Sequence, residues 1–252
     1  MDMIFVTGTA GSGKTLLTSA LKRWYVNRGE EAIAVNLDPG VVTLPYEPDV
    51  DVRLTVNLQD VMEDYGLGPN GALILAADLV ATKLGGIQEE IDSFSAEYVI
   101  VDTPGQTELF AFRESGEYIV KELKADSKTL LFLLDPLLAT TPVNFLSLAL
   151  LSASVGLRMS VPKISVLTKK DIAREGVKRI TEWSRDAKVF EDALADTKDS
   201  DQYSLSSELF RSLRRLAFGA DLYPVSSVTL EGFIALVGEV SRMGRGGEEF
   251  TD

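Results

Sequence analysis

The 252-residue sequence contains no cysteine and no histidine. The absence of cysteine excludes disulfides, thiolate nucleophiles and cysteine-bound zinc. The absence of histidine means that no imidazole acts as general acid or base near neutral pH, so carboxylates, lysine, tyrosine or the substrate itself must take that role.

Positive charge is also scarce. The chain has 25 Lys and Arg against 38 Asp and Glu, a formal net charge of −13. A surface that binds a nucleic-acid backbone needs clustered Lys and Arg, which we do not find, so we expect no nucleic-acid partner. A phosphate-binding loop remains compatible with this charge because such a loop acts locally.

No hydrophobic run is long enough to suggest a membrane span. The most apolar region, residues 129–157, is interrupted by Asp135, Pro136, Pro142 and Asn144, and predicts a buried strand followed by a helix. The first apolar run begins almost at the amino terminus and does not resemble a secretory signal. We therefore expect no membrane partner and a cytoplasmic location.

Short runs of Val, Ile and Leu alternate with longer helical patterns, which is typical of a mostly parallel sheet covered by helices on both faces, an α/β fold. Strands are predicted near residues 3–7, 32–37, 97–102, 129–135, 162–168 and 221–225. Helices are predicted near residues 13–28, 57–65, 72–92, 107–124, 142–155, 177–195, 206–218 and 230–242.

Two segments look added to a minimal sheet of this kind. The first covers about residues 43–95 and contains a helical hairpin, and the second covers about residues 174–219 and is helical. The glycine-rich, acidic residues 244–252 are expected to form a flexible tail. We predict one domain over residues 1–252, with two helical insertions that offer room for partner or oligomer contacts.

A glycine-rich loop lies close to the amino terminus. Residues 8–15 read Gly-Thr-Ala-Gly-Ser-Gly-Lys-Thr, the pattern G-x-x-x-x-G-K-[ST], between an apolar run and a helical pattern. In a phosphate-binding loop, Lys14 lies along the β- and γ-phosphates and the Thr15 hydroxyl ligates Mg²⁺. The alternative is an ordinary glycine-rich turn. The predicted nucleotide contacts are Ala10, Gly11, Ser12, Gly13, Lys14 and Thr15.

A second anchor follows a buried strand, where Val99-Ile100-Val101-Asp102 leads into Thr-Pro-Gly-Gln. Asp102 is predicted to hold magnesium, through a water, and the Gly105 N–H to contact the γ-phosphate. A strand-ending aspartate before Pro-Gly is common by itself. Here it is expected at the carboxyl edge of the sheet that carries the glycine-rich loop, where ligands bind in open α/β folds.

The sequence Thr168-Lys169-Lys170-Asp171, which follows another predicted strand, suggests that the bound nucleotide carries guanine. Asp171 would accept hydrogen bonds from the guanine ring N–H and exocyclic amine, and the stem of Lys169 would cover the base. Adenine offers neither donor at that edge and would leave a desolvated carboxylate unpaired, a loss of a few kcal/mol. The small residues Ser226 and Ser227, after a later strand, would let a backbone amide reach the guanine carbonyl.

With these three motifs in order, the chain resembles a P-loop GTPase. A further resemblance, to the GPN-loop GTPases, lies in the tripeptide Gly68-Pro69-Asn70, which is similar to the one that defines this family. Two more segments resemble the family, Leu37-Asp38-Pro39-Gly40 and residues 45–53, and the chain is most similar to its archaeal type. Gly40 stands where alanine is expected, with no expected effect on function. The resemblance implies a P-loop NTPase fold, a mostly parallel sheet between helices, that hydrolyses GTP to GDP with Mg²⁺.

The family resemblance further implies a homodimer in which each GPN loop points into the partner's nucleotide site. Asn70 would then donate its amide to the terminal phosphate in trans, with a tight turn as its alternative. Asp38 would orient the attacking water, with a turn cap before Pro39 as its alternative. Gln106 stands where many small GTPases carry a water-positioning glutamine, and the sequence does not rank Asp38 above Gln106.

No arginine stands out as a donor of positive charge to the reaction, since Arg113, Arg158 and Arg174 fit solvated faces or ion pairs better. We therefore expect slow hydrolysis, and a nucleotide-driven switch that assists protein complex assembly, as the resemblance implies. Two alternatives stay open: an ATP-dependent P-loop kinase or ligase, and a GTP-dependent binding scaffold in which hydrolysis is incidental.

Overall fold

The computed structural model of the protein describes residues 1–195, 200–215 and 222–244. Our predictions for residues 196–199, 216–221 and 245–252, including the acidic tail, lie outside the described residues. Within the described residues, seven strands form one parallel sheet in the order β3-β2-β4-β1-β5-β6-β7. The strands are β1 (Asp2–Gly8), β2 (Ala32–Asn36), β3 (Val50–Asp51), β4 (Tyr98–Asp102), β5 (Ser127–Leu134), β6 (Lys163–Leu167) and β7 (Leu222–Pro224).

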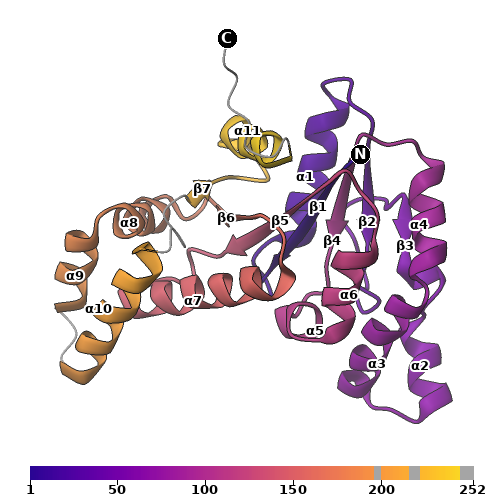
Figure 1. Cartoon of the computed structure of the whole chain (residues 1–252), viewed down its shortest axis with the longest axis horizontal. Helices are drawn as coiled ribbons and strands as arrows, with labels where there is room; N and C mark the ends of the chain where they lie inside the picture. The colour runs from indigo at the N-terminus through magenta and orange to yellow at the C-terminus, as the bar shows by residue number, and fades with distance from the viewer. Residues whose placement is uncertain (196–199, 216–221, 245–252) are drawn as a thin grey trace.

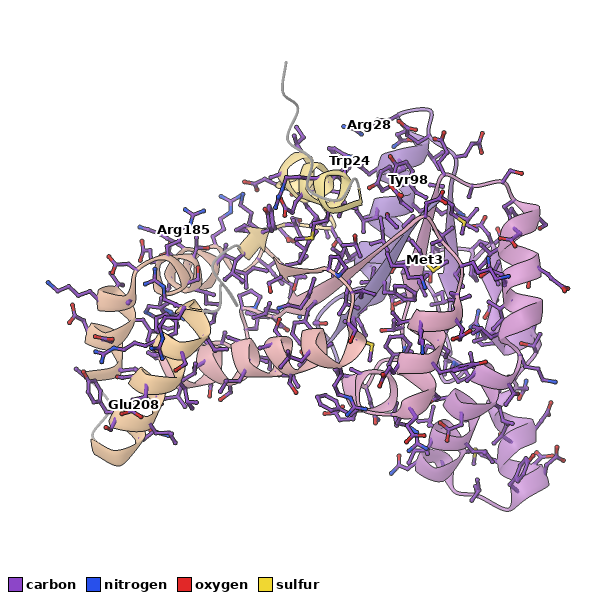
Figure 2. The ribbon with its side chains drawn as sticks, viewed as in Figure 1. Met3, Trp24, Arg28, Tyr98, Arg185 and Glu208 are labelled. Carbon is purple, nitrogen blue, oxygen red and sulfur yellow. The ribbon has the colours of Figure 1, made fainter. Side chains whose placement is uncertain are left out.

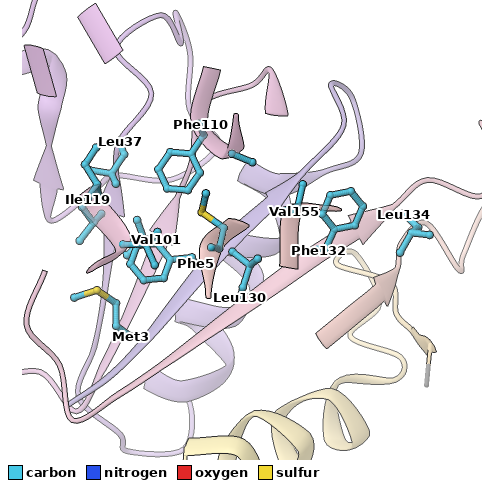
Figure 3. Packing of buried hydrophobic residues seen from close by; sticks show 14 of the residues in the cluster. Met3, Phe5, Leu37, Val101, Phe110, Ile119, Leu130, Phe132, Leu134 and Val155 are labelled. Carbon is cyan, nitrogen blue, oxygen red and sulfur yellow. The ribbon is translucent and has the colours of Figure 1, made fainter. Parts of the chain in front are cut away.

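Alternate residues of the strands enter two separate cores. In β1, Met3 and Phe5 belong to one core and Ile4 and Val6 to the other, because successive side chains of a strand point to opposite faces of the sheet. Figure 3 shows Phe5 packed near Val101 in the larger core. This burial on both faces explains why the strands read as continuous apolar runs.

Helices cover both faces of the sheet, as predicted. The core of Ile4 and Val6 is completed by α1 and α11, and the larger core by helices that include α3, α6 and α7 (Figure 1). The helices are α1 (Lys14–Val26), α2 (Leu58–Tyr65), α3 (Pro69–Thr82), α4 (Leu84–Ser93), α5 (Thr107–Ala111), α6 (Glu114–Glu122), α7 (Pro142–Met159), α8 (Arg174–Arg185), α9 (Ala187–Ala195), α10 (Ser200–Arg215) and α11 (Phe233–Gly244).

Three helices that the sequence predicted as continuous are broken. Residues 72–92 form α3 and α4, which bend by 62°. Residues 107–124 form α5 and α6, which are separated at Phe112 and at Arg113, the latter in an extended conformation, and a Cβ at Gly116 of α6 would be 1.8 Å from the Phe110 carbonyl oxygen of α5. Residues 177–195 form α8 and α9, separated by Asp186 in an extended conformation.

The two-residue strand β3 was not predicted, because it is too short to show a strand periodicity. It pairs with β2 at the edge of the sheet, with Asn36 opposite Asp51. In Figure 1, α2, α3 and α4 lie beside this edge, and α8, α9 and α10 lie at the opposite end of the molecule.

On length and composition alone, α7 and the bent pair of α3 and α4 are apolar enough to cross a membrane. In the protein, α7 places Phe145, Leu146 and Val155 in the larger core, against the sheet. The predicted succession of a strand and a helix in residues 129–157 therefore agrees with β5 and α7.

Aromatic side chains pack around the last turns of α1. The Tyr25 and Tyr98 rings stack with centroids 3.9 Å apart, and the Arg28 guanidinium lies 3.4 Å from the centroid of the Trp24 ring. Figure 2 shows Trp24, Arg28 and Tyr98 close to one another. Because Tyr98 begins β4, this cluster lies at the amino edge of the sheet. The opposite, carboxyl edge is where the loops after β1, β2, β4 and β6 meet.

Candidate functional site

The glycine-rich loop connects β1 to α1 at the carboxyl edge of the sheet. Gly8 has a φ of 148°, and a Cβ there would lie 2.6 Å from the Leu133 carbonyl oxygen of β5. Gly13, with a φ of 96°, is the N-cap of α1. Both positions therefore require glycine, and the first N–H groups of α1 are directed to the loop, as in an anion-binding loop.

Lys14 joins this loop to the loop after β4. Its side chain is only 5% exposed, and its Nζ donates to the carbonyl oxygens of Gly8 (2.8 Å), Thr9 (3.0 Å) and Gly105 (2.7 Å). Burial lowers the pKa of Lys14, whereas the nearby Asp102 and Asp38 raise it. A buried ammonium held mainly by carbonyl oxygens is suited to bind phosphate oxygens.

Asp102 ends β4 beside the loop and fits a role in magnesium binding. It is 2% exposed; its Oδ2 accepts a hydrogen bond from the Tyr46 hydroxyl at 3.3 Å, and its Oδ1 has no hydrogen-bond partner in the described chain. Burial raises the pKa of Asp102 to about 7, although the neighbouring Thr15, Lys14 and Tyr46 each lower this pKa. A hydroxyl and a carboxylate are donors that Mg²⁺ accepts.

The described residues contain no group of three or more acidic side chains able to hold a metal ion. A magnesium ion at Thr15 and Asp102 would therefore need phosphate oxygens and water for its remaining ligands. This is the usual way in which Mg²⁺ binds together with a nucleotide.

Asp38 lies between the end of β2 and the loop after β4. Its Oδ1 accepts from the Gly40 N–H at 2.9 Å, so it caps the turn at Pro39. Its Oδ2 accepts from the Gly105 N–H at 2.8 Å. Asp38 therefore forms the turn cap that was the alternative to a catalytic role. It also contacts the Gly105 N–H, which is the group expected to face the γ-phosphate.

The other two predicted catalytic residues are not joined to this group. The Gln106 side chain is exposed at the start of α5 and forms no cap hydrogen bond. Asn70 is exposed in the first turn of α3, which Gly68 caps and Pro69 begins, a usual position for proline. Neither side chain forms a hydrogen bond within the described residues.

Gly40, the departure from the expected alanine, has a packing role. A Cβ at Gly40 would lie 2.3 Å from Leu73 Cδ2. The glycine therefore lets α3 pack closely on the turn that holds Asp38. Alanine at this position would require the Leu73 side chain to move.

The residues predicted to recognise the base lie in two neighbouring loops. The Thr168 hydroxyl donates to the Ser12 carbonyl at 2.9 Å and so ties the end of β6 to the glycine-rich loop. The Lys169 ammonium pairs with Asp135 Oδ2 at 2.7 Å. The Asp171 carboxylate is partly exposed and forms no hydrogen bond or ion pair with the described residues, which leaves it available to a ligand.

The loop after β7 is joined to the loop after β6 by a hydrogen bond from the Lys170 N–H to the Val225 carbonyl at 3.1 Å. Ser226 is buried, and its hydroxyl accepts from the N–H groups of Val228 (3.2 Å) and Thr229 (3.0 Å). The Ser226 hydroxyl therefore has a structural role in a turn. Ser227 is also buried, next to it in the same loop.

The sequence interpretation missed several residues of this edge. Asp135, which holds Lys169, was noted only as an interruption of an apolar region, although an aspartate that ends a strand is the same signal that identified Asp102. Tyr46, Arg53 and Asn36 contact predicted site residues or their neighbours through side-chain hydrogen bonds. Tyr46 and Arg53 lie in the segment 45–53 that carries part of the family resemblance, which gave neither residue a role, and the contact between Tyr46 and Asp102 depends on tertiary structure.

Of the three arginines considered, Arg113 and Arg174 lie as expected, in an ion pair and on an exposed face, whereas Arg158 forms a hydrogen bond with a backbone carbonyl instead. Arg113 forms a two-point ion pair with Asp78 of α3 (3.0 and 2.6 Å). Arg158 donates to the Ala111 carbonyl at 2.9 Å. Arg174 is exposed on α8.

Comparisons with known proteins agree with this geometry. A family model described as "Conserved hypothetical ATP binding protein" matches residues 6–245. GPN-loop GTPase PAB0955 of Pyrococcus abyssi is 36% identical over 194 residues, which are 76% of this chain and 74% of the relative. The crystal structure of PAB0955, described as a GTPase in apo form, superposes with a TM-score of 0.84 at 29% identity and covers 96% of both chains.

Longer relatives match as well. GPN-loop GTPase 1 of Dictyostelium discoideum is 36% identical over 197 residues, 77% of this chain, and GPN-loop GTPase QQT2 of Arabidopsis thaliana is 31% identical over 241 residues, 92% of this chain. The aligned parts cover only 49% and 62% of these two relatives. Since the family match covers almost the whole sequence and the PAB0955 fold matches along its whole length, this chain belongs to the GPN-loop GTPase family.

Proposed function

We propose that this protein binds GTP together with Mg²⁺ and hydrolyses it slowly to GDP and phosphate by in-line attack of water. The observation that carries the proposal is the convergence of Lys14, Asp38 and Gly105. Lys14 Nζ lies 2.7 Å from the Gly105 carbonyl, and Asp38 Oδ2 lies 2.8 Å from the Gly105 N–H. These groups lie between the glycine-rich loop and Asp102, where a triphosphate would end.

Binding follows from the same groups. The buried Lys14 ammonium would exchange carbonyl contacts for phosphate oxygens, which carry full negative charge. Thr15 would hold Mg²⁺ directly and Asp102 would do so through a water. When bound, the metal would supply positive charge next to the transferring phosphoryl group. Asp171 would pair with the guanine edge, while the Lys169 stem, anchored by Asp135, covers the base.

Asp38 is our candidate for orienting the attacking water, in preference to Gln106. When the Gly105 N–H donates to a γ-phosphate, the Oδ2 of Asp38 loses its donor at that point and can accept a hydrogen bond from water. Gln106 is exposed and has no contact that would direct its amide there. Among the residues that the structure describes, no arginine donates a hydrogen bond to the Asp38 carboxylate or to Gly105, which supports slow hydrolysis.

We further propose a homodimer in which Asn70 acts on the partner's nucleotide. In its own chain the Asn70 side chain is exposed and without a hydrogen bond. Leu54, in the turn after β3, and Tyr65, at the end of α2, are 84% and 57% exposed, which supports a contact surface that includes these two elements. A role of the nucleotide-dependent dimer in assembling other proteins is part of this proposal.

ATP is the rival substrate, because the description of the matching family names ATP. A carboxylate at the base edge has no donor to meet on adenine, so Asp171 favours guanine. Titrating the protein, loaded with a fluorescent GDP analogue, with GTP and with ATP distinguishes the two. We expect GTP to displace the analogue at concentrations at least about 100-fold lower than ATP, and equal displacement would contradict guanine selection.

Single-turnover hydrolysis of radiolabelled GTP tests the catalytic assignment. We expect Asp38→Asn to slow hydrolysis about 100-fold or more, because the amide still accepts from Gly105 but loses the carboxylate charge. Gln106→Ala should stay within about threefold of the parent. A parent-like rate for Asp38→Asn together with a large loss for Gln106→Ala would reverse the assignment.

A further inference from the structure

Arg53 clamps a loop of the nucleotide edge at two points. It follows β3, and its Nε lies 3.0 Å from both carboxylate oxygens of Asp51, while its Nη2 lies 2.6 Å from Asp51 Oδ2. Its Nη1 donates to the Val41 carbonyl at 3.1 Å. One guanidinium therefore joins the beginning of the loop of residues 41–49 to the strand that follows it.

From Asp51 the hydrogen bonds continue inward to Asp38. Asp51 Oδ1 accepts from Asn36 Nδ2 at 2.9 Å. The fully buried Asn36 side chain also accepts from the Asp38 N–H at 3.0 Å and donates to the Asp38 carbonyl at 3.2 Å. An unbroken series of contacts thus runs from Arg53 through Asp51 and Asn36 to the backbone of Asp38, whose carboxylate holds Gly105.

The clamped loop also carries Tyr46, whose hydroxyl donates to Asp102 Oδ2 at 3.3 Å. At the end of the loop, Asp49 Oδ2 pairs with the Lys22 ammonium at 2.6 Å and accepts from the Ala34 N–H at 2.7 Å, whereas its first half has little to fix it. Val42 is 92% exposed and Thr43 and Pro45 are exposed, so the loop has few apolar contacts to define its conformation. Its path over Asp102 therefore depends on the contacts at its two ends, and Arg53 supplies those with Val41 at the beginning and with Asp51 just after the end.

We propose that Arg53 is a positioning residue for GTP hydrolysis. Through Asp51 and Asn36 it fixes the backbone position of Asp38. Through its contact with the beginning of the loop of residues 41–49 it also holds the Tyr46 hydroxyl against Asp102. The inference rests on the proposed function. Arginine is required because the nitrogens of its planar guanidinium donate to a carboxylate and to a carbonyl at the same time in a fixed geometry. A lysine ammonium has a single nitrogen and imposes no such geometry on the two acceptors.

The test compares Arg53→Lys with Arg242→Lys in the full chain. Arg242 also pairs with a carboxylate through two nitrogens, with its Nε 3.0 Å from Glu239 Oε2, but it lies in the last turn of α11, where Gly244 comes close to Asp2 at the amino edge of the sheet. We expect Arg53→Lys to lower the single-turnover rate about 10- to 100-fold and to raise the Mg²⁺ concentration for half-maximal binding of a fluorescent GTP analogue severalfold. Its affinity for the corresponding GDP analogue in EDTA should stay within about threefold, and Arg242→Lys should match the parent throughout.

Parent-like rate and Mg²⁺ dependence in Arg53→Lys would overturn the inference. So would a rate loss matched by an equal loss of GDP affinity in EDTA, because that would indicate a damaged fold. If Arg53→Lys does not fold, Tyr46→Phe removes only the hydroxyl and should still raise the Mg²⁺ requirement, and an unchanged requirement would overturn the inference. A parent protein that neither binds nor cleaves GTP would instead contradict the proposed function.

Discussion

Asp38 Oδ2 accepts a hydrogen bond from the Gly105 N–H at 2.8 Å, although the two residues are 67 positions apart in the sequence. The Gly105 carbonyl on the other side of the residue is held by Lys14 at 2.7 Å. A γ-phosphate would compete for both the N–H and the lysine. The contact between Asp38 and Gly105 is therefore the point at which we expect nucleotide binding to rearrange the loops after β2 and β4.

Base recognition can be tested at Asp171. In Asp171→Asn, the amide donates and accepts where the carboxylate only accepted, which matches xanthine and not guanine. We expect GTP affinity to fall about 10- to 100-fold and affinity for xanthosine triphosphate to rise. Competition against a fluorescent nucleotide measures both affinities. An unchanged preference for GTP would remove Asp171 from the base site.

Asp135 should support the same site at a distance. Its carboxylate, 4% exposed, anchors the Lys169 ammonium at 2.7 Å. We expect Asp135→Asn to weaken GDP binding about tenfold, because the charge-assisted contact that holds the lysine stem over the base is lost. Lys170→Ala removes a neighbouring lysine that pairs instead with the half-exposed Glu231, and it should bind GDP nearly as the parent does. Equal losses in the two variants would contradict the role of Asp135.

The predictable part of the site follows from local chemistry. Residues 8–15 and Asp102 could be located because the strands before them are buried on both faces and read as apolar runs. The hydrogen bonds from Tyr46 to Asp102 and from Arg53 to Val41 could not be predicted, because they join positions 56 and 12 residues apart that only the folded chain brings together. The breaks near Gly116 and Asp186 were missed for a similar reason, since helical periodicity continues across both.

Asp102 should make stability depend on pH in the absence of Mg²⁺ and nucleotide. Burial raises its pKa in the folded protein to about 7, above the ordinary carboxyl value of 3.8. The folded state therefore binds more protons than the unfolded state between these values, and this contribution to stability is lost as pH rises through that window, by at most about 1.4 kcal/mol per pH unit. We expect the Tm of the parent in EDTA to fall more steeply from pH 5 to pH 7.5 than that of Asp102→Asn. Equal slopes would contradict a buried, proton-binding Asp102.

Gly116 offers a test of the break between α5 and α6. A Cβ there would lie 1.8 Å from the Phe110 carbonyl oxygen, so Gly116→Ala should lower the free energy of unfolding by about 1–3 kcal/mol. Gly86 in α4 has open space around its Cβ position, and Gly86→Ala should raise it by about 0.5–1 kcal/mol. Denaturant titration of both variants measures these changes, and a neutral Gly116→Ala would show that α6 does not pack as described.

The central claim is that Lys14 and its loop bind the phosphates of a guanine nucleotide in the presence of Mg²⁺. Isothermal titration calorimetry of the metal-supplied protein with a non-hydrolysable GTP analogue tests it most directly, with Lys14→Ala alongside. The account predicts saturable binding of the GTP analogue by the parent and little heat with the matching ATP analogue. It also predicts that Lys14→Ala binds the GTP analogue about 100-fold or more weakly, because a charge-assisted contact to phosphate is lost. No binding of the GTP analogue by the folded parent, or equal binding by Lys14→Ala, would contradict it.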